Sequence, residues 1–115
     1  MIFGAQQVYK EMREVQTVEE FKNAISSNKK VLVDFFATWC GPCKVISPFL
    51  ESLSSQHPEI LFIKVDVDLN EEASTQAEVE AMPTFVAYLN GQEFVRFEGA
   101  NQAKLTSLVT KLENA

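Results

Sequence analysis

The sequence feature that most constrains the fold is the run at residues 31–37 (VLVDFFA), in which Asp34 is the only polar side chain. β-Branched and aromatic residues of this kind favour a strand. A strand without polar alternation is typical of one buried on both faces, as in parallel sheets that are covered by helices. The run therefore predicts an α/β fold in which this strand lies between two layers of helices.

Capping residues mark where helices begin in the rest of the chain. Thr17 followed by Glu20 forms a capping box that opens one helix, and Asn70 and Asn101 are placed to cap two more. A further helix follows the apolar run, at about residues 41–55. The sequence therefore predicts four helices.

Apolar segments between these helices predict four further strands, at residues 12–15, 61–67, 84–89 and 92–97. Asn90 and Gly91 separate the last two and accept the positive φ angles of a two-residue hairpin turn. Helices between the early strands imply right-handed parallel crossovers, and the hairpin adds antiparallel strands. The expected architecture is a five-stranded mixed β-sheet sandwiched by four α-helices.

Length and composition indicate a single domain over residues 1–115. The net charge of −6 disfavours binding to nucleic acid or to anionic membranes, which attract basic patches. No apolar run approaches the roughly 20 residues that are needed to cross a bilayer. Residues 1–10 form a loosely specified lead-in without the basic flank of a signal peptide, so we expect a cytoplasmic protein.

Two cysteines, Cys40 and Cys43, enclose Gly41 and Pro42 at the point where the apolar strand passes into a helix. Functional clefts gather at the carboxyl ends of such strands. Cysteines three residues apart in a first helical turn are also close enough to form a disulfide. We favour the interpretation that this pair is a redox-active dithiol.

Three other interpretations of the pair stay open. A structural disulfide around four residues contributes only about 2 kcal/mol through loop entropy, against about 3 kcal/mol for fifteen. A zinc site usually has four protein ligands, and His57 is the chain's single histidine, so two chains would have to contribute two thiolates each. The third interpretation is a pair of inert buried thiols, although Gly-Pro at a helix start is an unusual place for a deep core.

The position of Cys40 favours an ionised sulfur. The thiolate is the attacking species in thiol–disulfide exchange, and Cys40 is expected at a helix N-terminus, near unpaired amides and the positive end of the helix dipole. This environment lowers the pKa of the thiol from about 8.5 towards neutral pH, where an attacking thiol is most effective. Pro42 is tolerated in the first helical turn because its missing amide would have no partner there.

Residues 39–43 (WCGPC) are accompanied by further landmarks in a fixed order, namely Asp34, Pro48, Lys64, Met82-Pro83-Thr84, Gly91 and Gly99. With these landmarks the chain resembles the thioredoxin family over about residues 12–113. The resemblance implies the five-stranded thioredoxin fold and the activity of a protein-disulfide reductase. It also implies that no cofactor is bound and that the protein works in electron transport and cell redox homeostasis.

The same resemblance implies partners. Family members receive electrons from NADPH through the flavoprotein thioredoxin reductase, and their clients include peroxiredoxins, ribonucleotide reductase and methionine sulfoxide reductases. Only Cys40 and Cys43 are present, so the additional cysteines that link some family members into dimers are absent. We therefore expect a monomer.

The cysteine pair and the resemblance to thioredoxins together suggest a catalytic role for each of four residues. Cys40 attacks a client disulfide, and Cys43 then resolves the mixed disulfide. Asp34 is the candidate base for Cys43, because its apolar neighbours should raise its pKa; the alternative is an exposed aspartate at a strand end. The resemblance implies that Lys64 lies beside Asp34 and tempers the pKa of the carboxyl group; the alternative is a lysine that extends to solvent.

Client binding is expected around the cysteines. We predict that Trp39 forms a flat apolar lip. The resemblance implies that the Met82–Pro83 peptide bond is cis, which would expose the backbone of Met82 to an extended client. The remaining candidates for this surface are Gly41, Pro42, Gly99 and Ala100. His57, next to Pro58 after a helix, is predicted to be a surface residue.

Two other functions compete with that of a reductase. Oxidases and isomerases of the same fold usually carry histidine between the cysteines, whereas Gly41 and Pro42 stand here. A redox-independent protein-binding subunit of a larger complex is the second alternative, and an intact pair of cysteines does not exclude it.

Overall fold

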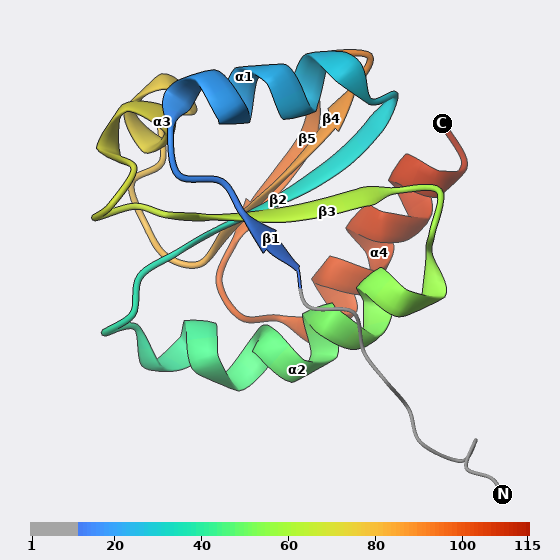
Figure 1. Ribbon diagram of the computed structural model, residues 1–115. Coiled ribbons are helices and arrows are strands. Elements are labelled where there is room, and N and C mark those ends of the chain that lie inside the picture. Colours follow the sequence, from blue (N-terminus) through green and yellow to red (C-terminus); the bar gives the residue numbers. More distant parts are fainter. Residues whose placement is uncertain (1–11) are drawn as a thin grey trace, which may run out of the picture.

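The computed structural model of the protein describes residues 12–115, so the predicted lead-in at residues 1–10 lies outside the described residues. Within that range the chain forms five strands and four helices (Figure 1). The strands are β1 (Arg13–Glu14), β2 (Lys30–Phe36), β3 (Leu61–Asp66), β4 (Thr84–Leu89) and β5 (Gln92–Glu98). The helices are α1 (Val18–Ser27), α2 (Gly41–Gln56), α3 (Glu71–Gln76) and α4 (Gln102–Glu113).

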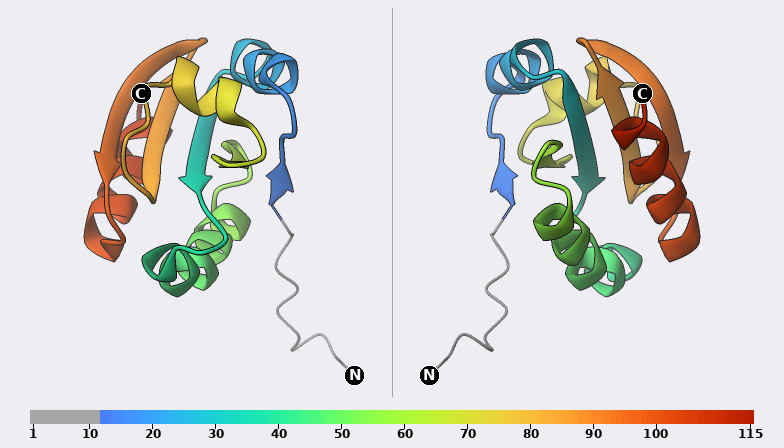
Figure 2. Two further views of the ribbon diagram at one scale, coloured as in Figure 1. Left: turned by 90° about the vertical axis from the view of Figure 1, so that its left-hand side faces the viewer. Right: turned by 90° about the vertical axis from the view of Figure 1, so that its right-hand side faces the viewer.

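The strands make one mixed sheet in the order β1-β3-β2-β4-β5. Strands β1, β3 and β2 are parallel, whereas β4 is antiparallel to both β2 and β5. Helices α1 and α3 cover one face of the sheet, and α2 and α4 cover the other (Figures 1 and 2). The predicted five-stranded mixed sheet sandwiched by four helices is confirmed.

Strand β2 is buried on both faces, as its composition predicts. Val31, Val33 and Phe35 belong to the core beneath α1 and α3, whereas Leu32 belongs to the core beneath α2 and α4. These four side chains are fully buried, and each contributes roughly 1.5–3 kcal/mol of transfer free energy. The carboxyl end of this well-anchored strand leads directly to the two cysteines.

The predicted helix caps are confirmed. The Thr17 side chain accepts a hydrogen bond from the amide of Glu20 at 3.1 Å, and the Glu20 carboxylate accepts one from the amide of Gln16 at 2.8 Å. Asn70 and Asn101 also accept hydrogen bonds from amides in the first turns of α3 and α4. Such caps satisfy amides that have no partner within the helix.

The hairpin turn also has its predicted geometry, since Asn90 and Gly91 have φ angles of 53° and 82°. Positive φ at both central residues matches the right-handed twist of the flanking strands. None of the helices within residues 12–115 is long and apolar enough to cross a membrane.

Candidate active site

The two cysteines are joined as a disulfide at the start of α2. Cys40 is the N-cap residue of this helix, Gly41 and Pro42 are its first residues, and the two cysteine Cα atoms are 5.3 Å apart. Proline suits this position because its fixed φ angle is helical and it needs no hydrogen-bond partner. The local sequence therefore starts a helix and brings both sulfurs into one turn.

The surroundings of Cys40 Sγ favour negative charge. The amide of Cys43 donates a hydrogen bond to this sulfur at 3.1 Å, and the helix N-terminus adds a positive potential. On the other side, the sulfur lies 3.7 Å from the carbonyl oxygen of Met82. Both cysteines are largely buried, with 5% and 7% of their surface exposed, and they pack against Ala37, Phe36, Val67 and Met82.

Asp34 lies behind the cysteines in the middle of β2. It is only 7% exposed, and its Oδ1 atom has no hydrogen-bond partner among the described residues. Burial raises the pKa of Asp34 to about 7, and the positive charge of Lys64 keeps it from rising further. Asp34 and Cys43 line the same pocket of about 420 Å³. A carboxyl group with this pKa is suited to accept a proton near neutral pH.

Lys64 is the register partner of Asp34 in the parallel pair β2–β3. It lines the same pocket, and its Nζ atom lies 5.3 Å from the centre of the Phe36 ring. The prediction that Lys64 neighbours Asp34 and tempers its pKa agrees with this arrangement. The alternative, a lysine directed only to solvent, does not.

The Met82–Pro83 peptide bond is cis, as the sequence predicts. The carbonyl oxygen of Pro83 accepts a hydrogen bond from the amide of Gly99 at 2.9 Å, which ties the start of β4 to the end of β5. Gly99 has a φ angle of 100°, which disfavours any residue with a side chain. The loop that contains Met82 is therefore held in place beside Cys40.

Trp39 precedes Cys40 and leaves 67% of its surface exposed. Its Nε1 atom donates a hydrogen bond to Asp68 Oδ2 at 2.9 Å. Asp68 follows the end of β3, where the buried Asp66 carboxylate accepts hydrogen bonds from the amides of Asp68 and Leu69. The loop after β3 thus fixes the ring of Trp39 at the mouth of the site.

Comparison with known proteins agrees with this geometry. The family model described as Thioredoxin matches residues 12–111. Thioredoxin-1 of Schizosaccharomyces pombe is 46% identical over 98 residues, which make up 85% of this chain and 95% of that protein. Thioredoxin of Homo sapiens is 40% identical over 103 residues, or 88% of this chain and 98% of that protein. The X-ray structure of Fasciola hepatica thioredoxin has a TM-score of 0.85 at 48% identity, with 88% of this chain and 99% of that chain covered.

The chain belongs to the thioredoxin family. It is a thiol–disulfide oxidoreductase with the function of a protein-disulfide reductase. Thioredoxins carry out this chemistry with their own cysteines and without a bound cofactor. The Cys40–Cys43 disulfide is the oxidised state of such a pair, and the redox interpretation therefore prevails over the staple, zinc and inert-thiol interpretations.

The structure separates the predicted site residues into two groups. Asp34, Lys64 and Cys43 line the pocket on the inner side of α2. The exposed residues Trp39, Gly41, Pro42 and Ala100 and the half-exposed Met82 and Gly99 lie outside that pocket, and Pro83 is buried behind Met82. The described structure thus brings Asp34, Lys64 and Cys43 together in one pocket, whereas the residues predicted to bind clients do not line it.

His57, which is predicted to be a surface residue, is only partly exposed. Its side chain is only 18% exposed, and its Nδ1 atom lies 3.2 Å from the carboxylate of Glu113. The C-terminal end of α4 returns to the end of α2 and covers the ring. This contact between distant parts of the chain leaves no signal in the sequence around His57.

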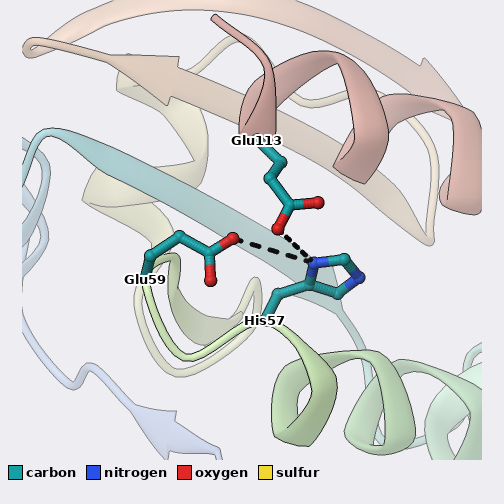
Figure 3. Close-up of side chains that lie close together, drawn as sticks. All are labelled: His57, Glu59 and Glu113. Carbon is teal, nitrogen blue, oxygen red and sulfur yellow. Dashed lines mark ion pairs between the residues drawn. The ribbon is translucent and has the colours of Figure 1, made fainter.

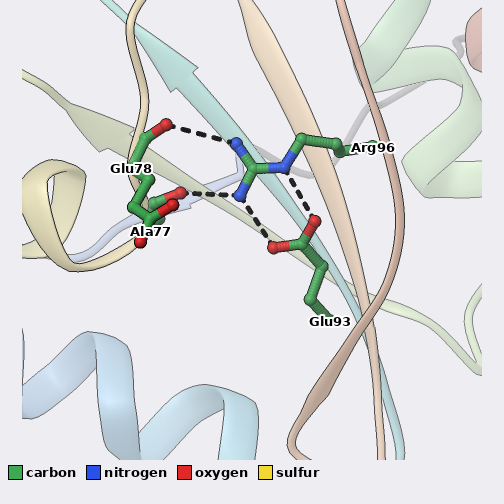
Figure 4. A network of polar contacts seen from close by, with 4 residues as sticks. All are labelled: Ala77, Glu78, Glu93 and Arg96. Atoms are coloured by element: carbon green, nitrogen blue, oxygen red, sulfur yellow. Dashed lines mark hydrogen bonds and ion pairs between the residues drawn. The ribbon is translucent and has the colours of Figure 1, made fainter.

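Sequence reasoning also missed two residues that hold loops at the site. Asp68 is one, and its only signal is its place just after a predicted strand. Arg96 on β5 is the other: Figure 4 shows its guanidinium between the Glu93 carboxylate and the loop after α3. Its Nη2 atom donates to the carbonyl of Ala77 at 2.6 Å, and its Nη1 atom donates to that of Glu78 at 3.5 Å. Arg96 thus anchors the segment that leads to Met82.

Proposed function

We propose that this thioredoxin reduces protein disulfides through a mixed disulfide on Cys40, which Cys43 resolves with Asp34 as the base. The observation that carries the proposal is the hydrogen bond from the Cys43 amide to Cys40 Sγ at the start of α2. This amide and the helix dipole stabilise a thiolate on Cys40 more than on Cys43. The sulfur of Cys40 is therefore the one prepared to attack.

In the first step, the Cys40 thiolate attacks one sulfur of the client disulfide. A bond forms between Cys40 Sγ and that sulfur, the client S–S bond breaks, and the second client sulfur leaves as a thiolate that takes up a proton. The leaving thiolate departs faster when its own pKa is low. The exposed ring of Trp39 and the backbone of Met82 are the surfaces that the client would contact.

In the second step, Cys43 transfers its proton to Asp34 and attacks Cys40 Sγ. The Cys40–Cys43 disulfide forms, the mixed disulfide breaks, and the other client sulfur leaves and is protonated. Two electrons have then passed from the protein to the client. The pocket that Asp34 and Cys43 share supports this proton transfer, and so does the pKa of Asp34 near 7.

We further propose that the chain works in the cytoplasm as a monomeric single domain. NADPH would return it to the dithiol form through thioredoxin reductase. Peroxiredoxins, ribonucleotide reductase and methionine sulfoxide reductases are the proposed clients. The similarity to Thioredoxin-1 of Schizosaccharomyces pombe and of Saccharomyces cerevisiae supports this assignment.

The test is a coupled assay in which absorbance at 340 nm follows NADPH oxidation in the presence of thioredoxin reductase and an oxidised peroxiredoxin. The wild-type protein should sustain turnover, and Cys40→Ser should abolish it. A parallel assay replaces NADPH and the reductase with dithiothreitol. Activity with dithiothreitol but not with NADPH would contradict the proposed electron source, and no activity in either assay would contradict the reductase mechanism.

A further inference from the structure

The end of the molecule remote from the disulfide carries a cluster of three potential metal ligands. His57 caps the C-terminal end of α2, Glu59 lies in the connection to β3, and Glu113 is the last residue of α4. Figure 3 shows the two carboxylates directed at the same ring nitrogen of His57. One ligand atom from each residue lies within 4.8 Å of the other two.

The spacing of these atoms is close to that of a zinc site. The Nδ1 atom of His57 lies 3.2 Å from Glu113 Oε2 and 3.9 Å from Glu59 Oε2. Ligands at about 2.0–2.2 Å in a tetrahedron around zinc are roughly 3.3–3.5 Å apart. The Glu59 and Glu113 side chains are 42% and 40% exposed, so small rotations can bring all three atoms to that spacing.

The ring nitrogen itself lacks a hydrogen-bond partner. The Nδ1 atom of His57 is buried, and within residues 12–115 no group makes a hydrogen bond of acceptable geometry with it, although Glu113 is near. A buried polar atom of this kind is costly unless something binds it. A metal ion held between the ring and the two carboxylates would satisfy it.

Charge also favours a cation at this place. Among residues 12–115, no lysine or arginine forms an ion pair with Glu59 or Glu113, so two carboxylates face one imidazole. Lys30 is a further cation close to this cluster, and its Nζ atom donates to the main-chain carbonyl of Glu113 rather than to the carboxylate. With a neutral imidazole, the two carboxylates and Lys30 leave one net negative charge, which a divalent ion offsets.

We propose that His57, Glu59 and Glu113 bind a divalent transition-metal ion such as Zn²⁺. One imidazole and two carboxylates are ligands that suit this ion, with water completing the coordination. The main chain helps to position His57, because the amide of Ile60 donates a hydrogen bond to the His57 carbonyl at 3.1 Å. Binding would connect the ends of α2 and α4.

The proposed site is separate from the redox chemistry. Helix α2 has 16 residues and separates His57 from Cys40 by about 24 Å at 1.5 Å per residue. The bound ion should therefore stabilise the fold without contact with the disulfide. Binding of the metal ion does not depend on which proteins reduce this thioredoxin or are reduced by it.

The first experiment uses metal-free protein in the oxidised state, so that the thiolates of Cys40 and Cys43 cannot bind the added ion. Zn²⁺ is titrated while NMR follows the imidazole resonances, which are unambiguous because the chain has one histidine. We expect a saturable change that is complete at one equivalent of Zn²⁺. An imidazole that does not respond to Zn²⁺ would overturn the proposal.

The second experiment measures the affinity of the same oxidised protein for Zn²⁺ by calorimetry. His57→Ala and Glu113→Gln should each weaken binding by at least about 10–100-fold. Mutation of a residue that only hydrogen-bonds to a metal ligand already reduces affinity by this factor, and removal of a ligand itself should reduce it at least as much. Glu71→Gln is the matched control, because Glu71 is an exposed carboxylate in the first turn of α3, and it should leave the affinity unchanged. Equal affinity in all four proteins would overturn the site. Should His57→Ala fail to fold, Glu113→Gln and the imidazole titration still decide.

Discussion

Asp34 and Lys64 lie opposite each other in the register of the parallel strands β2 and β3, and both side chains line the pocket next to Cys43. Parallel register places the two side chains on the same face of the sheet. The buried carboxyl group of Asp34 is thereby held next to the ammonium group of Lys64, within the strand that leads to the cysteines. The pKa of Asp34, and with it the proposed proton transfer from Cys43, therefore depends on the register of β2 and β3.

The stability of the oxidised protein should fall as the pH rises from about 4 to 7. Burial raises the pKa of Asp34 from 3.8 to about 7, so the folded state binds this proton more tightly than the unfolded state. The stabilisation by the proton is complete below the unfolded pKa and is lost as the pH passes the folded pKa, with a total of about 4 kcal/mol. In urea unfolding at pH 4, 6 and 8, Asp34→Asn should gain stability relative to the wild type as the pH increases. A constant difference between the two proteins would contradict the raised pKa.

Asp34→Asn should slow release of the reduced client more than formation of the mixed disulfide. The amide cannot accept the proton of Cys43, whereas the attack by Cys40 does not use this group. We expect release to slow by about 10²-fold, the lower end of what a positioned base contributes. Stopped-flow measurement of both steps with one client disulfide tests this, and equal slowing of the two steps would argue against Asp34 as the base.

Lys64→Gln should shift the pH dependence of client release to higher pH. The positive charge of Lys64 lowers the pKa of Asp34, so its removal leaves the carboxyl protonated over a wider range. Lys104→Gln is the matched control, because the Lys104 side chain is exposed on α4. Only the main-chain amide of Lys104 takes part in the helix cap, and the substitution keeps that amide. If both variants gave the wild-type pH profile, the coupling between Lys64 and Asp34 would be unimportant.

Asp68→Ala should release the ring of Trp39 at the mouth of the site. The substitution removes a solvent-exposed hydrogen bond of 2.9 Å. Its loss should lower the free energy of unfolding by about 0.5–1.5 kcal/mol. Trp39 is the only tryptophan, so its fluorescence anisotropy should fall in the variant and stay unchanged in the control Glu72→Ala. Unchanged anisotropy in Asp68→Ala would show that Asp68 does not hold the ring.

Arg96→Gln should loosen the segment between α3 and Met82. The guanidinium is bound to the carbonyls of Ala77 and Glu78, and loss of these contacts should reduce stability by about 1–3 kcal/mol. Hydrogen exchange should increase at residues 77–81, and more than in Glu93→Gln, which keeps the arginine. Equal exchange in the two variants would mean that the contact with Glu93, rather than the carbonyls, anchors the loop.

The helices and strands of the fold can be predicted from the sequence because their signals are local. The apolar run of β2, the caps at Thr17, Asn70 and Asn101, and the turn at Asn90 each act over a few neighbouring residues. Their bounds differ from prediction by only one or two residues at most ends. Short-range physics therefore specifies nearly all of this architecture.

The contacts that hold the site together could not be predicted from the local sequence, because they join segments that are distant in the chain. Trp39 and Asp68 are 29 residues apart, and Arg96 is 19 residues from Ala77. The pair of His57 with Glu113 depends on how two helix ends meet. Such pairs are set by tertiary packing, which apolar periodicity does not report. Asp34 is the exception, because its apolar neighbours along β2 already indicate burial.

The most direct test of the central claim is intact-mass analysis after the reduced single-cysteine variants react with a protein that has an accessible disulfide. Cys43→Ser should accumulate a stable mixed disulfide through Cys40, because the attacking sulfur is present and the resolving one is absent. Cys40→Ser should accumulate little or none at neutral pH. Comparable trapping by both variants, or trapping by Cys40→Ser alone, would contradict Cys40 as the attacking sulfur.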